Sequence, residues 1–259
     1  MLKSKICTFE QLDGREFRSW KKEIKEPLNA SHRKIWEYCY IAQALSERGL
    51  LKPGIKGLGF AVGNEPLVSL FAKYGCKITA TDIGLEAAKL GGWADTGQHC
   101  SDISGLNSAD ICPHGIFRDN VSFREVDMND IPPDLKNFDF CWSCCALEHL
   151  GSIRKGMDFV MRAMECLKPG GYAVHTTEFN VSSNNRTVDN NKDVLFRKKD
   201  LIQLAKDLTS EGHTIELTFD HGKTPNDMHI DEYPFSDIHI KVRYKDFVLT
   251  SYGLIIRKA

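Results

Sequence analysis

The chain has 259 residues, of which 42% are hydrophobic and 27% are charged, and its formal net charge is −1 at pH 7. These values are typical of a globular protein and disfavour a nucleic-acid partner, because no arginine- or lysine-rich arm accompanies them. No apolar stretch approaches the ~20 residues that a membrane span needs. No long apolar segment follows the first lysines, so we expect a cytoplasmic protein without a signal peptide.

Nine cysteines, an odd number, lie mostly inside apolar runs. This placement favours reduced, buried thiols over disulfides. Cys141 and Cys144 have a C-x-x-C spacing, but no second pair of ligands at a suitable spacing accompanies them. We therefore expect no metal site.

The first 50 residues read as helical, with a helix from an N-cap at Ser31 to a stop at Gly49. Strands then alternate with helices, which predicts an α/β fold with a doubly wound, mostly parallel, seven-stranded sheet. We expect a helical cap over 1–50 and a single α/β domain over 51–259. The predicted strands are 55–58, 77–81, 121–126, 138–142, 172–177, 214–219 and 247–256, and the predicted helices are 65–73, 85–90, 153–167 and 195–208.

Irregular stretches interrupt this alternation at 91–120, 178–196 and 220–239. The first is rich in glycine, serine and aspartate and also holds Trp93 and His99. A plain linker does not need embedded aromatic residues, so we expect this stretch to form a functional lid.

A glycine-lined turn follows the first strand of the alternating region. Gly59-Phe60-Ala61-Val62-Gly63 ends that strand, and Asp82 ends the next strand, 23 residues after Gly59. Such a turn lets the backbone approach a nucleotide-like ligand, and a carboxylate at this spacing can accept hydrogen bonds from ribose hydroxyls. The pair indicates a cofactor-binding enzyme.

Further segments follow the later strands in a fixed order. Val126-Asp127-Met128 follows the third strand, and Ser143 and Leu147-Glu148-His149-Leu150 follow the fourth. Leu167-Lys168-Pro169-Gly170-Gly171 introduces the fifth. This set resembles the class I S-adenosylmethionine-dependent methyltransferases over roughly residues 50–256, and more loosely a bacterial subgroup that modifies sugars, polysaccharides or small metabolites.

The resemblance implies a Rossmann-like methyltransferase fold, S-adenosyl-L-methionine as the cofactor and a small-molecule or glycan acceptor. The sequence carries no signal for an oligomeric state. The implied cofactor-binding residues divide between the methionine part, the ribose and the adenine. They are Gly59, Gly63 and the backbone near Ser143 for the methionine part, Asp82 for the ribose, and Ile83, Asp127 and Met128 for the adenine, and Phe60 and Ala61 of the glycine-lined turn also belong to the set.

Two positions depart from the family pattern. Gly57 stands where an acidic residue is usual, and Ala61 replaces the middle glycine. Alanine permits a close approach of the backbone if its φ is negative. We interpret the site as modified but working.

His149 and Glu178 are the candidate general bases for removing a proton from an acceptor hydroxyl. His149 follows the fourth strand, near the crevice where such sheets receive a substrate, and its intrinsic pKa suits this role. Glu178 follows the fifth strand and competes for it. His229, Asp231 and His239, together with His175 and Glu178, are metal-ligand types, but without a compact spacing we favour a substrate-lining role.

Two other interpretations stay open. A dinucleotide-dependent oxidoreductase would need a final glycine where Val62 stands, which weakens that interpretation. A non-catalytic cofactor-binding regulatory subunit would keep the same pocket without turnover.

Overall fold

A nine-stranded, mostly parallel sheet runs through the molecule in the computed structural model, which describes residues 1–93, 98–107, 109–190 and 193–259. Seven strands form its main path in the order β1-β11-β7-β6-β3-β4-β5, and two short strands, β8 and β10, pair with β11. The strands are β1 (Lys5–Ile6), β3 (Lys56–Phe60), β4 (Lys77–Asp82), β5 (Val121–Glu125), β6 (Phe138–Cys144), β7 (Leu167–Asn180), β8 (Thr214–Ile215), β10 (Val242–Tyr244) and β11 (Phe247–Arg257).

Strands β3 to β7 are parallel, whereas β11 runs antiparallel to β7 and β1 runs antiparallel to β11. The α/β class and the parallel-dominated, doubly wound sheet are therefore confirmed. The sheet has nine strands rather than the expected seven, because β1 and β10, which were not predicted, also pair with β11. Nearly every residue of β11 is buried, as expected for a strand covered on both faces.

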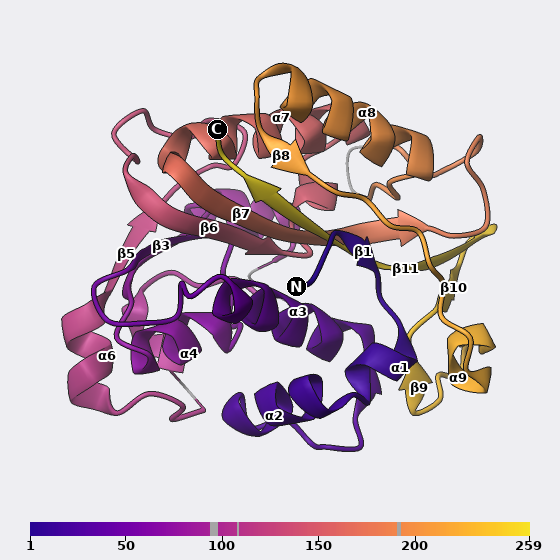
Figure 1. Cartoon of the computed structure of the whole chain (residues 1–259), viewed down its shortest axis with the longest axis horizontal. Coiled ribbons are helices and arrows are strands. Elements are labelled where there is room, and N and C mark those ends of the chain that lie inside the picture. The colour runs from indigo at the N-terminus through magenta and orange to yellow at the C-terminus, as the bar shows by residue number, and fades with distance from the viewer. Residues whose placement is uncertain (94–97, 108, 191–192) are drawn as a thin grey trace.

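Helices cover the two faces of the sheet as separate layers (Figure 1). Helices α7 and α8 pack on one face, and α2, α3, α4 and α6 pack on the other, each layer with its own apolar core. The described helices are α1 (Phe9–Leu12), α2 (Arg15–Glu23), α3 (Arg33–Glu47), α4 (Leu67–Lys73), α5 (Leu85–Gly91), α6 (His114–Asn120), α7 (Ile153–Ala163), α8 (Lys198–Ser210), α9 (Pro225–Met228), and the 3-10 turns η1 (Ile103–Asn107), η2 (Leu147–His149) and η3 (Met164–Cys166). Among the described residues, no helix is both long enough and apolar enough to cross a bilayer.

The first 50 residues contain more than helices. Strand β1 extends the main sheet, and β2 (Ser31–His32) pairs in parallel with β9 (Ile238–His239). The cap of α3 is His32, whose Nδ1 accepts a hydrogen bond from the Lys34 amide at 3.0 Å, so the predicted cap at Ser31 is wrong by one residue. The division into a cap and an α/β domain stays a prediction.

Several predicted boundaries also shift. The helix predicted over 153–167 ends at Ala163, and β7 already begins at Leu167. The irregular stretch 91–120 contains η1 and α6, although its residues 94–97 and 108 lie outside the described residues. The strand predicted over 214–219 is reduced to β8, and the stretch 220–239 holds α9 and β9.

One glycine fixes how α3 sits on the sheet. A Cβ on Gly253 of β11 would lie 2.2 Å from Cε1 of Tyr40, so the tyrosine ring occupies the space a side chain would need. The Tyr40 hydroxyl donates to the Lys3 carbonyl oxygen at 2.9 Å, and its ring stacks on Trp36. The middle of α3 is thereby held over β11.

We predict that Gly253→Ala destabilises the fold by about 1–3 kcal/mol, because the added methyl group must displace the Tyr40 ring. Urea denaturation measures the change. Gly115→Ala is the matched control, since a Cβ there would meet nothing within 4 Å on helix α6. Equal stability of the two variants would contradict this packing.

Candidate active site

A cleft of about 280 Å³ opens at the carboxyl ends of β3, β4 and β6. Open α/β sheets receive their ligands at this edge. The walls come from α3, the glycine-lined turn, the segment after β5 and the segment after β6. The lining residues are Lys34, Tyr38, Ala61, Val62, Gly63, Asn64, Glu65, Asp82, Ile83, Trp93, Gln98, His99, Val126, Asp127, Met128, Asn129, Cys144, Cys145, Ala146, His149 and Leu150.

The carboxylate of Asp82 organises the base of this cleft. Its Oδ2 accepts hydrogen bonds from the amides of Gly63 at 3.0 Å and Cys100 at 3.1 Å, and its Oδ1 accepts one from Ile83 at 2.8 Å. Burial raises the pKa of Asp82, although the three amides act in the opposite direction. One side chain thus joins the turn after β3, the end of β4 and the loop after α5.

The turn after β3 has a left-handed backbone at two positions. Gly63 has φ +50°, and a Cβ there would lie 2.3 Å from the carbonyl oxygen of Gln98. Ala61 has φ +48°, so the condition that its φ is negative is not met. A non-glycine residue with this backbone is strained, and its small side chain limits the clash.

The missing acidic residue at position 57 has a packing explanation. A Cβ on Gly57 would lie 2.4 Å from Cζ of Phe140 and 2.9 Å from Cδ1 of Ile78. Aromatic packing of Phe140 against Phe71 fills this space. An apolar contact therefore lies under the turn, where an acidic residue was expected.

Three of the predicted cofactor residues lie beneath the cleft rather than on its wall. Gly59 makes room for the Trp142 ring, since a Cβ would lie 2.5 Å from Cζ2. Phe60 is fully buried, and Ser143 is hydrogen bonded to Nδ1 of His175 at 2.8 Å. The other six predicted residues line the cleft: Ala61, Gly63, Asp82, Ile83, Asp127 and Met128.

The segment after β5 supplies the wall nearest Asp82. Val126 donates its amide to the Asp82 carbonyl oxygen at 2.8 Å, which fixes the next two residues beside β4. Asp127 accepts a hydrogen bond from the Asn129 amide at 2.8 Å with Oδ1, and Met128 is almost fully buried. The cleft therefore combines a second carboxylate with an apolar thioether surface.

Glu65 is a cleft residue to which the sequence interpretation assigned no role. Its Oε1 accepts a hydrogen bond from Nε1 of Trp142 at 2.5 Å, and only 6% of the residue is exposed. Burial raises the pKa of Glu65 to about 8, although Trp142 and Lys34 act in the opposite direction. This carboxyl group is therefore largely protonated at neutral pH.

A buried ion cluster lies behind the opposite wall, centred on Glu37 of α3. Glu37 accepts hydrogen bonds from the hydroxyls of Ser251 and Thr176 and pairs with Arg33 and Lys34. Burial alone would raise the pKa of Glu37, but the two cations hold it below its usual value. The cluster connects α3 to β7 and β11.

The two candidate bases have different surroundings. His149 of η2 lines the cleft, and its ring lies 4.5 Å from that of Trp93, centroid to centroid. Glu178 of β7 does not line it, and its Oε1 accepts a hydrogen bond from Nη2 of Arg33 at 2.5 Å. Burial raises the pKa of Glu178 even beside this guanidinium.

The histidines considered as metal ligands do not gather into one group among the described residues. Nδ1 of His239 lies 2.6 Å from Oδ2 of Asp231, and His175 bonds to Ser143 instead. Within the described part of the chain, one group of three potential ligands comes together, and it consists of Cys145, Glu148 and Glu178. The sequence gives no sign of this group, because its members come from two strands' ends and an intervening turn.

Comparison with known proteins identifies the central part of the chain. Residues 58–175 match the family described as a methyltransferase domain. No protein of curated function matches the sequence.

Three solved structures share the fold. Magnesium protoporphyrin IX methyltransferase from Synechocystis PCC 6803 aligns with a TM-score of 0.53 at 12% identity, over 97% of this chain and 98% of that one. A protein described as a sarcosine dimethylglycine methyltransferase from Galdieria sulphuraria gives 0.50 at 17% identity, over 87% and 88%. A protein described as a methyltransferase from Bacillus halodurans C-125 gives 0.50 at 16% identity, over 84% and 98%.

The raised pKa of Glu65 predicts a stability that falls with rising pH. The folded chain keeps this proton up to about pH 8, whereas an unperturbed glutamic acid loses it near 4.5. Between these values the folded state binds more protons than the unfolded state, so the free energy of unfolding decreases as the pH rises. Glu65→Gln keeps an acceptor for Trp142 and removes the titration.

Thermal denaturation of both proteins from about pH 5 to pH 8 measures this effect. We expect Tm of the wild type to fall more steeply with pH than Tm of Glu65→Gln. Parallel curves would contradict a protonated Glu65 in the folded chain.

Proposed function

Because this chain belongs to the class I S-adenosylmethionine-dependent methyltransferases, we propose that it methylates a hydroxyl oxygen of a small-molecule or glycan acceptor. S-adenosylmethionine supplies an electrophilic methyl group when it is bound. The contribution of the protein is to align the donor with the acceptor and to exclude water, which is worth several kcal/mol.

The fit of the cleft to the cofactor supports roles for its two carboxylates. A carboxylate has about four acceptor sites, and backbone amides use three of those on Asp82, so one is left for a ribose hydroxyl. Asp127 would accept a hydrogen bond from the adenine amino group, between the apolar surfaces of Ile83 and Met128. Gly63 would let the backbone approach the methionine part, beside the small side chain of Ala61. Gly59, Phe60 and Ser143 support the wall from beneath.

The position of His149 decides between the two candidate general bases. It lines the cleft directly, whereas Arg33 holds the carboxylate of Glu178. We assign proton removal from the acceptor hydroxyl to His149. Glu178 lies behind the cleft wall, where it accepts the hydrogen bond from Arg33.

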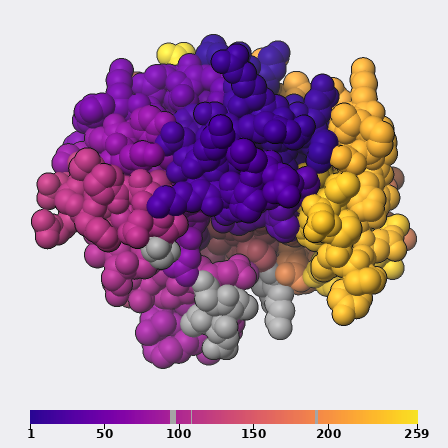
Figure 2. All heavy atoms as spheres, turned by 90° about the horizontal axis from the view of Figure 1, so that it is seen from below, coloured from indigo at the N-terminus to yellow at the C-terminus, as the bar shows by residue number. Residues whose placement is uncertain are grey.

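A row of rings supports an acceptor with a flat or sugar-like face. Tyr233 and Phe235 are 88% and 57% exposed, and Phe235 contacts His239 edge to face at 4.9 Å. His239 in turn stacks at 4.5 Å on His32, the residue before Arg33. The face shown in Figure 2 is hollowed between the N-terminal helices in indigo and this C-terminal segment in yellow. Rings of this kind stack well on sugars and aromatic compounds.

The cysteines support a reducing compartment, and we propose the cytoplasm. All nine are unpaired and eight are buried. Unpaired thiols of this kind persist in compartments that keep cysteines reduced.

The direct test incubates the purified chain with S-adenosylmethionine labelled in the methyl group and a panel of sugars, glycans, polyols, phenols and amines. We expect transfer to a hydroxyl acceptor. Transfer confined to amines would contradict O-methylation. Tight cofactor binding without transfer to any acceptor would favour a regulatory subunit, and a thermal shift with nicotinamide cofactors alone would favour an oxidoreductase.

We further predict that His149→Gln lowers kcat by about 10²–10⁴-fold, because the proton acceptor is lost, while the Kd for the cofactor changes little. Steady-state kinetics and calorimetry measure the two quantities. His114→Gln, at a site whose side chain is 86% exposed, is the matched control and should behave as wild type. A His149 variant with normal kcat would show that another group is the general base.

A further inference from the structure

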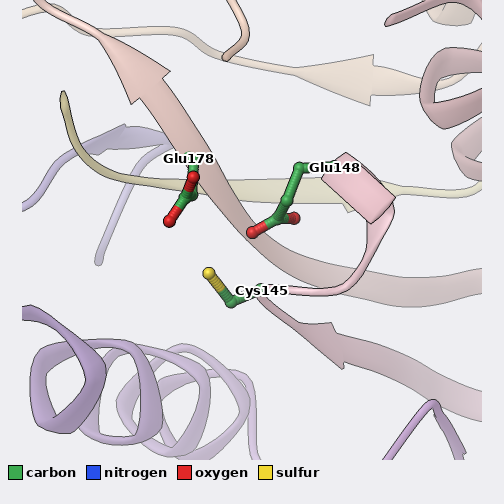
Figure 3. Close-up of side chains that lie close together, drawn as sticks. All are labelled: Cys145, Glu148 and Glu178. Carbon is green, nitrogen blue, oxygen red and sulfur yellow. The ribbon is translucent and has the colours of Figure 1, made fainter. Parts of the chain in front are cut away.

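A thiol and two carboxylates meet behind the wall of the cleft. Cys145 follows β6, Glu148 belongs to η2 and Glu178 lies near the end of β7. One ligand atom from each lies within 4.8 Å of the other two. Figure 3 shows the sulfur and the two carboxylate groups directed toward one common space. Cys145 also lines the cleft, so this space adjoins the proposed acceptor side.

Glu148 is the observation that points to a missing ligand. The residue is fully buried, and its Oε2 accepts a hydrogen bond from the Thr177 hydroxyl at 3.2 Å. Its Oε1 is buried and has no hydrogen-bond partner. A buried carboxylate oxygen without a partner is costly, so a native site of this kind calls for a cation or a proton there.

The nearby cations do not compensate the negative charge of the Glu148 carboxylate. Arg33 directs its hydrogen bonds to Glu37, Cys145, Ser251 and Glu178. Lys34 pairs with Glu37.

Arg33 and Lys34 therefore face three carboxylates, of Glu37, Glu148 and Glu178. His149 also faces Glu178, and with its imidazole neutral, as its role as the base requires, one negative charge is in excess. A divalent ion that also converts the Cys145 thiol to a thiolate would bring this group of charges to neutrality.

We propose that Cys145, Glu148 and Glu178 bind a divalent zinc-type ion through one sulfur and two carboxylate oxygens. Sulfur disfavours magnesium and calcium, which prefer oxygen ligands, and suits zinc. Three protein ligands leave a fourth position of a tetrahedral ion open, as in catalytic zinc sites. Because Cys145 also lines the cleft, an acceptor bound there would be within reach of that fourth position.

This inference rests on the proposed function and deepens it. The ion accepts a lone pair of the acceptor hydroxyl and makes its proton more acidic, and His149 takes that proton. The oxygen then forms a bond to the methyl carbon as the carbon–sulfur bond breaks. The electron pair of that bond stays on sulfur, and S-adenosylhomocysteine leaves. No oxidant or reductant is required.

The test uses the tag-free full chain, freed of metal by a chelator and then titrated separately with Zn²⁺ and Co²⁺. We expect one equivalent of zinc to bind. We also expect Co²⁺ to give a thiolate-to-cobalt charge-transfer absorption. Cys145→Ser should abolish that absorption, and Glu148→Gln should weaken zinc binding by at least about tenfold. Cys112→Ser, which removes another buried thiol, and Glu216→Gln, at an exposed carboxylate, are the controls and should bind metal as wild type does.

Two results would overturn the inference. One is a wild-type chain that takes up no stoichiometric zinc, which would leave a proton shared between Glu148 and Glu178 as the explanation of the buried oxygen. The other is metal binding that survives both substitutions. Calorimetry with S-adenosylhomocysteine on the same samples distinguishes failure of the metal site from failure of the proposed function. A chain that binds S-adenosylhomocysteine but no zinc contradicts only the metal site. A chain that does not bind S-adenosylhomocysteine contradicts the proposed function.

Discussion

The cofactor side of the molecule depends on the buried carboxylate of Asp82. Three backbone amides, from Gly63, Ile83 and Cys100, converge on its two oxygens. These amides belong to the turn after β3, the end of β4 and the loop after α5. Because each amide would be costly to bury without an acceptor, the carboxylate fixes the course of all three segments at once. The shape of the cleft floor follows from this one group.

The acceptor side has a different organising centre. Glu37 is fully buried on α3 and collects two cations and two hydroxyls from α3, β7 and β11. Tyr40, one turn further along, packs into the space above Gly253 and sets the height of the helix over the sheet. Polar pairing and apolar packing on one helix thus place Arg33 beside Glu178 and Lys34 on the wall of the cleft.

Much of this arrangement could be predicted from the sequence, because it depends on local patterns. Alternating strands and helices indicate a parallel sheet, and the ends of parallel strands bring Asp82 and Asp127 to one edge. Their places on the wall of the cleft agree with that reasoning. The long strand β11 and the helix α4 were also close to their predicted positions.

The remainder depends on contacts between distant segments. The ring of Phe140 explains the glycine at position 57, and no local pattern records that contact. The hydrogen bond between Glu65 and Trp142 joins residues 77 positions apart, and the left-handed backbone of Ala61 has no local sequence signal.

The group of Cys145, Glu148 and Glu178 likewise forms only when η2 folds against β7. Its members are separated by up to 33 residues in the sequence, and two of them lie close together without a recognised metal-ligand spacing.

A crystal structure of the chain with S-adenosylhomocysteine would show directly whether Asp82 and Asp127 hold the adenosine. We expect the adenosine between Ile83 and Met128, with a ribose hydroxyl within hydrogen-bond distance of Asp82 and the adenine amino group beside Asp127. The sulfur should point toward His149. Adenosine bound elsewhere, or a ribose without contact to Asp82, would contradict a cofactor-binding role for these carboxylates.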